Sequence, residues 1–325
     1  MTSDPMDDQT HLDADLDGED VPDLDDGDAD AQPSGSGAIR KPGPGLYIVA
    51  TPIGNAGDIS LRALDILRGV DAIACEDTRV TAKLLRRYGI RTRMVPYHDH
   101  NAARMRPVLL DRIAGGQAIA LVSDAGTPLV SDPGFKLVRE ARDRGLGLTH
   151  LPGANAAVTA LVLSGLPSDR FLFGGFLPAK SAARRSELEM FRALPATLIF
   201  YESAQRLAEM LADVAAALGA REVAVARELT KLFEEVRRGT AADLAHHYTQ
   251  SGPPKGEVVV VVGPPAADAA AADAADMDSL LRQALSGGMS VRDAAAHVAT
   301  ITGQPRKQVY ARALQLGTGG HGAGP

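Results

Sequence analysis

The sequence predicts an α/β fold made of two α/β domains, followed by a small C-terminal helical module. Two observations along the 325 residues indicate this class. Before residue 165, three strand-like apolar runs each end in a loop of small, turn-forming residues that leads into a helical pattern. Between residues 166 and 263, Val- and Ile-rich runs alternate with further helical patterns. The chain is long enough for two core-forming domains plus tails.

The first unit begins with a buried strand expected over residues 46–50. A turn rich in Pro, Gly and Asn follows, and the next helix is expected to begin near Ser60. That helix places three leucines on one face: Leu61, Leu64 and Leu67. A further apolar run, residues 70–74, ends in the single cysteine, Cys75, and predicts a strand with a buried thiol. One cysteine can form neither an intrachain disulfide nor, alone, a metal site.

The second unit is the most informative, because its loop combines polar groups with a glycine. A strand is expected over residues 118–122 and a helix over residues 135–144. The loop between them carries the carboxylate of Asp124 near the hydroxyl of Thr127, and Gly126 allows the backbone to approach a ligand closely. Neither G-x-G-x-x-G nor G-x-x-x-x-G-K-[ST] occurs in it, so the usual phosphate-binding motifs are absent from this loop.

The third unit runs from a strand that starts at residue 148, through a Pro-Gly break, into a helix of small residues that reaches residue 163. Three such units in succession predict a parallel sheet. The carboxyl ends of parallel strands lie at one edge of their sheet, so we expect the three loops to converge on one small-molecule cleft.

The second domain is expected to follow a connection over residues 166–178. Its expected elements, in order, are a helix over residues 181–192, a strand over 197–201, a helix over 204–218, a strand over 222–226, a polar loop and an all-valine strand over 258–262. Two connections are too short for a crossover helix, so some of these strands are expected to be antiparallel.

The C-terminal part is expected to contain three short helices, over residues 279–286, 291–301 and 306–316, with Ser290 as the N-cap of the second. With Gly303 at a turn, this module resembles a helix-turn-helix. The expected organisation is a disordered acidic tail over residues 1–43, an N-terminal domain over 44–165, a C-terminal domain over 166–263, a linker over 264–276, the helical module over 277–317 and a flexible tail over 318–325.

The net charge of −7 conceals a basic body, since 13 of the 41 acidic residues lie in residues 1–39, where Lys and Arg are absent. The remaining chain holds 34 basic against 28 acidic residues, a net charge of +6, which suits a polyanionic substrate. No apolar run approaches the ~18–20 residues of a membrane span, and the acidic N-terminus does not read as a signal peptide. We therefore expect a soluble cytoplasmic enzyme.

Several stretches resemble the ribosomal RNA small subunit methyltransferase I family of the tetrapyrrole-methylase superfamily. These are residues 46–58, 75–79, 97–101, 123–134, 152–157 and 226–231, and the resemblance runs from about residue 45 to 262 and more weakly to 316. It implies a cofactor cleft between two α/β domains, with S-adenosylmethionine as methyl donor. It also implies 2′-O-methylation of a decoding-region cytidine, cytidine 1402, in 16S rRNA.

Similarity to the superfamily also implies which residues bind the cofactor. The matching positions are Ile53, Asp124, Thr127, Asn155, Ala156, Tyr201, Ala226 and Gly256. Small-residue loops suit this ligand, because bulky side chains would block the backbone groups that bind its polar atoms. Asp124 is the foremost of these candidates, with an Asx turn inside its own loop as the alternative. The sequence departs from the family pattern at Ala204-Gln205, where Pro-His is more usual, which weakens the case for a catalytic histidine there.

A ribose hydroxyl is a poor nucleophile at neutral pH, so methyl transfer to it gains from a proton acceptor. Three clusters compete for that role: residues 97–101, 227–231 and 75–79. The favoured candidates are His98, Asp99, Glu228 and Lys231. Lys231 follows a buried strand, where a lysine pKa can fall. On an extended segment His98 and His100 would share a face opposite Asp99, but no third ligand is evident, so we expect no metal site.

Two basic clusters are expected to contact the RNA backbone: Lys83, Arg86, Arg87, Arg91 and Arg93 in one, and Lys180, Arg184 and Arg185 in the other. Aromatic residues make up only 4% of the chain, so recognition should depend on shape more than on base stacking. The expected partner is 16S rRNA within the small ribosomal subunit, and a homodimer stays open.

Two other functions remain open at this stage. A tetrapyrrole C-methyltransferase acting on a corrinoid precursor would use the same cleft, but it needs neither a basic rim nor a C-terminal module. A helix-turn-helix regulator would place its last helix, with Arg306, Lys307 and Arg312, in the DNA major groove. That function leaves the three small-residue loops unexplained.

Overall fold

The computed structural model describes residues 41–265, 267–302 and 304–318. The expected acidic tail up to residue 40, the turn residue Gly303 and residues 319–325 of the expected C-terminal tail lie outside the described residues. Within the described part of the chain, no helix is long and apolar enough to cross a membrane.

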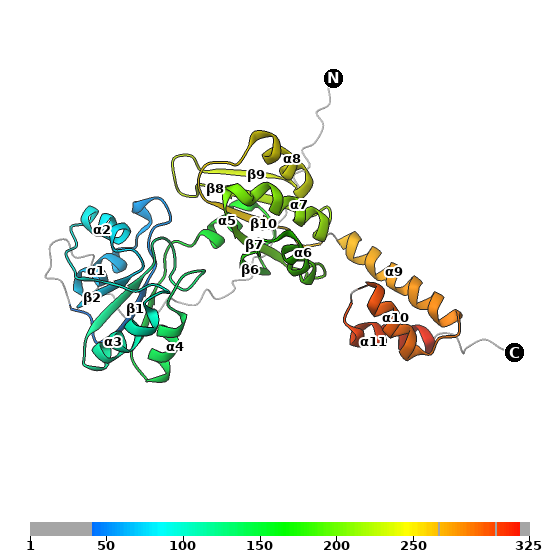
Figure 1. The fold of residues 1–325 in the computed structure, drawn as a ribbon, viewed down its shortest axis with the longest axis horizontal. Coiled ribbons are helices and arrows are strands. Elements are labelled where there is room, and N and C mark those ends of the chain that lie inside the picture. Colours follow the sequence, from blue (N-terminus) through cyan, green and yellow to red (C-terminus); the bar gives the residue numbers. More distant parts are fainter. Residues whose placement is uncertain (1–40, 266, 303, 319–325) are drawn as a thin grey trace, which may run out of the picture. The chain divides into compact units, whose positions relative to one another are not determined.

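The N-terminal domain contains a parallel sheet, as predicted, and the sheet has five strands in the order β3-β2-β4-β1-β5. Figure 1 shows this domain with the helices α1 to α4. Its strands are β1 (Gly45–Val49), β2 (Ala72–Cys75), β3 (Met94–Pro96), β4 (Ala118–Val122) and β5 (Leu148–Leu151). The helical elements that connect them are η1 (Ala56–Asp58), α1 (Leu61–Gly69), α2 (Thr78–Arg87), α3 (Ala102–Ala114) and α4 (Phe135–Asp143).

This sheet has an apolar core on each face. The core on one face includes Leu64 and Leu67 of α1 and Leu85 of α2. The core on the other includes residues of α3 and α4, such as Leu137. Every residue of β2 and β4 is buried, which is why both strands read as continuous apolar runs. Helix α1 begins next to Ser60, as expected, and the Ser60 side chain caps it. The Cys75 thiol is buried, as expected, and free.

The next helix, α5 (Ala156–Ser164), packs on the second sheet. Its apolar face, with Ala160 and Leu161, joins a core made mainly of residues from β7, β8 and β10. The segment after β5 therefore belongs by its packing to the second sheet. This packing places the loop at Asn155 between the two sheets.

The second sheet has five strands in the order β6-β7-β10-β8-β9. Their bounds are β6 (Phe171–Phe176), β7 (Thr197–Glu202), β8 (Glu222–Arg227), β9 (Glu235–Thr240) and β10 (Val258–Val262). Strand β6 runs parallel to β7, whereas β10 is antiparallel to both β7 and β8, which confirms the predicted antiparallel pairing. The accompanying helical elements are α6 (Ser181–Met190), η2 (Ala204–Arg206), α7 (Leu207–Leu218) and α8 (Ala241–Ser251).

The prediction of a polar loop before the all-valine strand is wrong, because β9 and α8 occupy that stretch. Strand β9 lies at the edge of the sheet beside β8, and its residues Arg237 and Arg238 are exposed. An edge strand of this kind lacks the apolar signal that marks a central strand.

The C-terminal module consists of α9 (Ala267–Ser286), α10 (Val291–Thr302) and α11 (Arg306–Thr318) around a small apolar core. The first helix of the module begins at Ala267 and not at residue 279 as expected, so most of the predicted linker over residues 264–276 is helical. Alanine is the strongest helix former, and the run after the two prolines is mostly alanine. The Oγ of Ser290 accepts a hydrogen bond from the Asp293 backbone N–H at 3.1 Å, as expected for an N-cap.

Candidate active site

A cleft of about 540 Å³ lies between loops of the two α/β domains. The first domain and the start of α5 contribute residues 124–127, 130–132 and 155–156. The second domain contributes residues 201–205 and 256–259. The loops of the parallel sheet therefore converge on one cleft, as their small residues predicted.

Seven of the eight residues implied to bind the cofactor line this cleft: Ile53, Asp124, Thr127, Asn155, Ala156, Tyr201 and Gly256. The eighth, Ala226, does not. It is fully buried in β8 opposite Val259 and belongs to the core beneath the cleft. The structure thus brings most of the set together, and contact with the cofactor stays a prediction for each of them.

The loop after β4 is tied to its neighbours by hydrogen bonds. Thr51 and Gly126 exchange two backbone hydrogen bonds, at 2.8 and 3.0 Å. The hydroxyl of Thr127 donates to the Ala154 carbonyl at 3.1 Å. An Oδ1 of Asp124 accepts from the Asp77 backbone N–H at 3.0 Å, so this carboxylate binds the end of β2 and does not close an Asx turn in its own loop. The three loops form one connected surface.

The Asn155 side chain already has a structural role. Its Oδ1 accepts hydrogen bonds from the backbone N–H groups of Ala157 and Val158, at 3.0 and 3.2 Å, and so caps α5. The cap fixes the side chain at the cleft and leaves its amide N–H₂ as the group that can donate to a ligand.

A second carboxylate in the cleft, Asp132, was not singled out from the sequence. It follows Leu129 and Ser131, whose φ angles of +75° and +62° lie in the left-handed region that costs energy for residues other than glycine. Burial raises the pKa of Asp132, although the neighbouring Ser123 hydroxyl lowers it in part. The signal that could have identified it is the repeated Ser-Asp pair, at positions 123–124 and again at 131–132.

Two aromatic residues of the second domain, Phe176 and Tyr201, line another part of the cleft. The ring of Tyr201 lies edge-on to Phe173 and Phe176, with centroid distances of 4.8 and 5.6 Å. Burial raises the pKa of the Tyr201 phenol, and the nearby charge of Asp132 adds to the rise. Ala204 and Gln205, where the sequence departs from the family pattern, also line this part of the cleft.

Glu228 and Lys231, two of the expected catalytic residues, form an ion-paired cluster with Glu257. The Nζ of Lys231 lies 2.8 Å from Glu228 Oε1 and 2.9 Å from Glu257 Oε2. Burial lowers the pKa of Lys231, but these two pairs outweigh it and the pKa is raised. The expectation of a lowered lysine pKa is therefore wrong. Neither Glu228 nor Lys231 lines the cleft.

The same cluster ties the two domains together. The backbone N–H of Asn55 donates to the Thr230 hydroxyl at 3.0 Å. A Cβ added to Gly54 would lie 2.5 Å from Lys231 Cγ, so only glycine allows this close approach. On the other side, a Cβ added to Gly256 would lie 2.1 Å from Glu228 Oε1. Glu228 and Lys231 thus pack against two glycines, the cleft residue Gly256 and Gly54, which is next to the cleft residue Ile53.

His98 and Asp99 lie at a turn and are not among the residues that line the cleft. The backbone N–H of Asn101 donates to the His98 carbonyl at 3.0 Å, so the expectation of an extended segment is wrong here. The rings of His98 and His100 lie 6.0 Å apart, and the Nδ1 of His98 is buried without a hydrogen-bond partner in the described part of the chain. A catalytic role for His98 or Asp99 stays a prediction.

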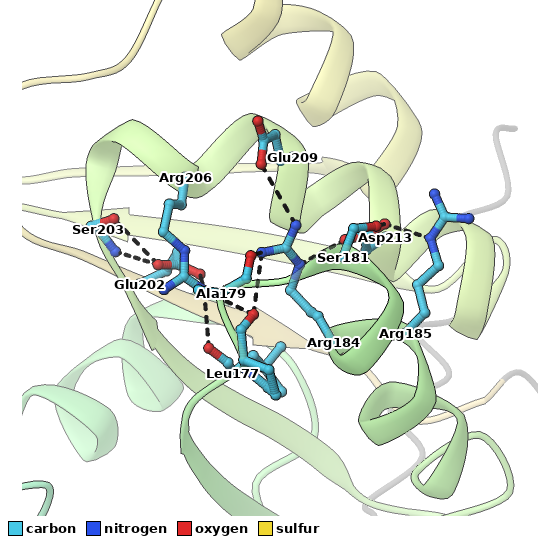
Figure 2. A network of polar contacts seen from close by, with 11 residues as sticks. Leu177, Ala179, Ser181, Arg184, Arg185, Glu202, Ser203, Arg206, Glu209 and Asp213 are labelled. Atoms are coloured by element: carbon cyan, nitrogen blue, oxygen red, sulfur yellow. Dashed lines mark hydrogen bonds and ion pairs between the residues drawn. The ribbon is translucent and has the colours of Figure 1, made fainter.

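The prediction that Arg184 contacts RNA is wrong, because its side chain is fully buried. Figure 2 shows its guanidinium directed at Asp213, with Nε 2.6 Å from Oδ2. Arg184 lies on the face of α6 that also buries Leu188, one turn further on. Arg185 is half exposed and pairs with the other oxygen of Asp213 at 2.5 Å. The sequence showed two adjacent arginines but not which one faces the core.

The same network supports the cleft wall (Figure 2). Arg206 lies 3.0 Å from Oε2 of the buried cleft residue Glu202 and donates to the carbonyl oxygens of Leu177 and Pro178 at 2.9 and 3.1 Å. The carbonyl of Pro178 also accepts from Arg184 at 3.4 Å. Glu202, which the sequence did not indicate, is therefore held at the cleft by its ion pair with Arg206.

Two α/β domains with a cleft between their loops define the class of this protein. Residues 45–245 match the family model of Tetrapyrrole (Corrin/Porphyrin) Methylases. Among solved structures, the fold is similar to diphthine synthase, with a TM-score of 0.53 and 18% identity over 67% of this chain and 89% of that one. It is also similar to a cobalt precorrin-4 methyltransferase, with a TM-score of 0.51 and 17% identity over 67% of this chain and 94% of that one.

Curated relatives narrow the class. The chain is 53% identical to ribosomal RNA small subunit methyltransferase I of Mesorhizobium japonicum, over 86% of this chain and 95% of the relative. It is 56% identical to the enzyme of that name in Erythrobacter litoralis (85% and 96%) and 47% identical to that of Escherichia coli O157:H7 (83% and 94%). Residues 271–317 match the RsmI C-terminal HTH domain. The chain belongs to the ribosomal RNA small subunit methyltransferase I family, which confirms the resemblance.

Membership of this family of methyltransferases confirms S-adenosylmethionine as the cofactor. The cleft fits that molecule in size and chemistry. Its volume lies within the roughly 300–1,000 Å³ of small-molecule sites. It combines an apolar surface, which includes Ile53 and Val259, with the carboxylate of Asp124 and the amide of Asn155. These are the groups that an adenosyl and an amino-acid moiety require.

Proposed function

We propose that this protein transfers the methyl group of S-adenosylmethionine to the 2′-oxygen of a cytidine ribose in 16S rRNA, cytidine 1402 of the decoding region. The observation that carries the proposal is the cleft between the two domains, lined by seven of the eight residues implied to bind the cofactor. The rRNA substrate is supported by the names of relatives that this chain covers almost completely, which are ribosomal RNA methyltransferases.

The cofactor supplies an electrophilic methyl group on a positively charged sulfur. In the cleft, Asp124 accepts from the cofactor's polar N–H or O–H groups, and the Asn155 amide donates to its acceptors. Ile53 and Val259 exclude water from the apolar part. Exclusion of water strengthens each of these polar interactions.

The proton of the ribose hydroxyl must leave as the oxygen forms its new bond to carbon. We propose Asp132 as the acceptor, because it lines the cleft and burial raises its pKa, so it is a stronger base than an exposed aspartate. Glu228 and Lys231 then act as positioning residues through Gly256 and Gly54. His98 and Asp99 remain the alternative acceptors.

Exposed cations lie on both α/β domains. We propose that the exposed cations Lys83, Arg86, Arg87, Lys180 and Arg185 contact RNA phosphates, and that the substrate is the small ribosomal subunit in the cytoplasm. We also propose that the protein forms a homodimer.

The experiment that tests the function is transfer of a tritiated methyl group from S-adenosylmethionine to 30S particles and, in parallel, to naked 16S rRNA. We expect label in rRNA with the 30S particle as acceptor. Absence of label from both acceptors, with cofactor binding intact in calorimetry, would contradict the proposed rRNA substrate.

A further inference from the structure

A second hollow, of about 370 Å³, adjoins the cofactor cleft. The two share Ile53, Asp124 and Ala125, so these residues form a common wall. The far side of the hollow is formed by α2, which contributes both apolar and cationic side chains: Val80, Lys83, Leu84 and Arg87. Volume and lining are those of a small-molecule subsite.

The cations reach this hollow because of helix periodicity. Lys83 and Arg87 are four residues apart and lie on the same face of α2. Leu85, on another face, is buried in the core of the first sheet. Arg86 does not line the hollow, and its Nε donates to the Ala82 carbonyl of its own helix at 3.2 Å.

Both cations lack an internal partner in the structure. The side chains of Lys83 and Arg87 are exposed, and neither forms an ion pair with any described residue. Other arginines nearby are neutralised: Arg79 lies 2.6 Å from Asp77, and Arg68 lies 3.3 Å from Asp65. Two unpaired cations beside an apolar surface present the chemistry that binds a phosphate next to a base or sugar.

Methyl transfer requires the acceptor oxygen to contact the methyl group, so the target nucleotide must lie next to the cofactor. We infer that this second hollow is the subsite for the target nucleotide of the RNA. Its ribose lies toward the wall at Ile53 and Asp124, its base lies against Val80 and Leu84, and its phosphate lies between Lys83 and Arg87. The inference rests on the proposed rRNA substrate and divides the basic cluster into residues that bind the reacting nucleotide and residues that do not.

The test compares the double variant Lys83→Ala/Arg87→Ala with a matched control, Lys136→Ala/Arg139→Ala. The control removes the same charge from the same domain, but from α4, which packs on the opposite face of the first sheet. Steady-state methylation of 30S particles gives KM and kcat, and calorimetry gives the affinity for S-adenosylmethionine.

We expect the Lys83/Arg87 variant to raise the KM for 30S particles at least about tenfold, because tenfold is the scale of a single lost charge-assisted hydrogen bond. Its salt dependence should also become shallower than that of the wild type, because fewer counterions are released on binding. Cofactor affinity should stay within about twofold of the wild type, and the Lys136/Arg139 control should keep the wild-type KM and salt slope. Cytidine 5′-monophosphate should inhibit the wild type and inhibit the Lys83/Arg87 variant less.

Three results would overturn the inference. Equal KM values for the two double variants would mean that only overall charge matters. Weakened S-adenosylmethionine binding in the Lys83/Arg87 variant would mean that these cations hold the cofactor carboxylate. An unchanged KM would mean that the hollow is not a substrate site. Failure of the proposed function would give a different result from failure of this inference, because the wild type itself would then leave rRNA unlabelled.

Discussion

Replacement of Asp213 by Ala should destabilise the protein strongly, because it leaves the charge of Arg184 buried without its main partner. The side chain of Arg184 is 0% exposed and that of Asp213 is 3% exposed. Removal of one member of a buried pair typically costs about 3–5 kcal/mol. Glu209, at 3.8 Å from Arg184 Nη2, is 77% exposed and can compensate little.

Thermal unfolding measured by calorimetry is the assay. At about 2–4 °C for each kcal/mol in domains of this size, the loss corresponds to a fall in Tm of roughly 6–20 °C. Glu209→Ala is the matched control and should cost less than about 1 kcal/mol, since that pair is weak and solvated. The double variant Arg184→Met/Asp213→Leu should recover part of the loss, because it removes both charges.

The effect should also depend on pH. Burial raises the pKa of Asp213, but hydrogen bonds from Arg185, Arg184 and Ser181 outweigh it, so the pKa is lowered. A carboxylate with a lowered pKa in the folded state stabilises the protein above its unfolded pKa of about 3.9, and that contribution is lost as the pH falls below this value. The Tm difference between wild type and Asp213→Ala should therefore be full at pH 7 and shrink in acid. A Tm difference under about 2 °C at pH 7 would refute the reasoning.

Three further predictions concern the cleft. Asp124→Ala should weaken S-adenosylmethionine binding by about 1–3 kcal/mol, because polar groups of the buried cofactor lose their partner, and unchanged affinity in calorimetry would remove this loop from the site. Asp132→Asn should lower kcat by about 10²–10⁴-fold with little change in cofactor affinity. In the wild type, kcat should fall as the pH drops through the raised pKa of Asp132. A small effect of the substitution on kcat would exclude Asp132 as the proton acceptor. Gly256→Ala should destabilise the protein more than Gly89→Ala. Both positions have a positive φ, +92° and +66°, but only at Gly256 would the new Cβ meet a side chain, that of Glu228 at 2.1 Å. Equal losses of Tm in the two variants would show that Glu228 moves away at no cost.

Elements with strong, uniform burial could be predicted from the sequence. Strands β4 and β10 are buried at every residue, so their apolar runs match the strands end to end. The edge strand β9 could not be recognised, because three of its six residues are charged: Glu235, Arg237 and Arg238. The alanine-rich start of α9 was misread because composition alone does not separate a linker from a helix of small residues.

The site was predictable where backbone geometry defines it. Loops of small residues after parallel strands converge, and this places Asp124 and Asn155 in one cleft. What the sequence could not provide was the direction of individual side chains. Arg184 points into the core and Lys231 into two carboxylates, because packing between helices and pairing between loops decide such orientations.

The most direct test of the central claim is the chemical position of the new methyl group. A 2′-O-methyl group blocks alkaline cleavage of the adjoining phosphodiester, because the 2′-oxygen is the nucleophile in that cleavage. 16S rRNA labelled by this protein from tritiated S-adenosylmethionine should therefore release its label, after alkaline hydrolysis, in a dinucleotide that contains 2′-O-methylcytidine. Label recovered in a mononucleotide, or in a methylated base, would contradict transfer to the ribose oxygen.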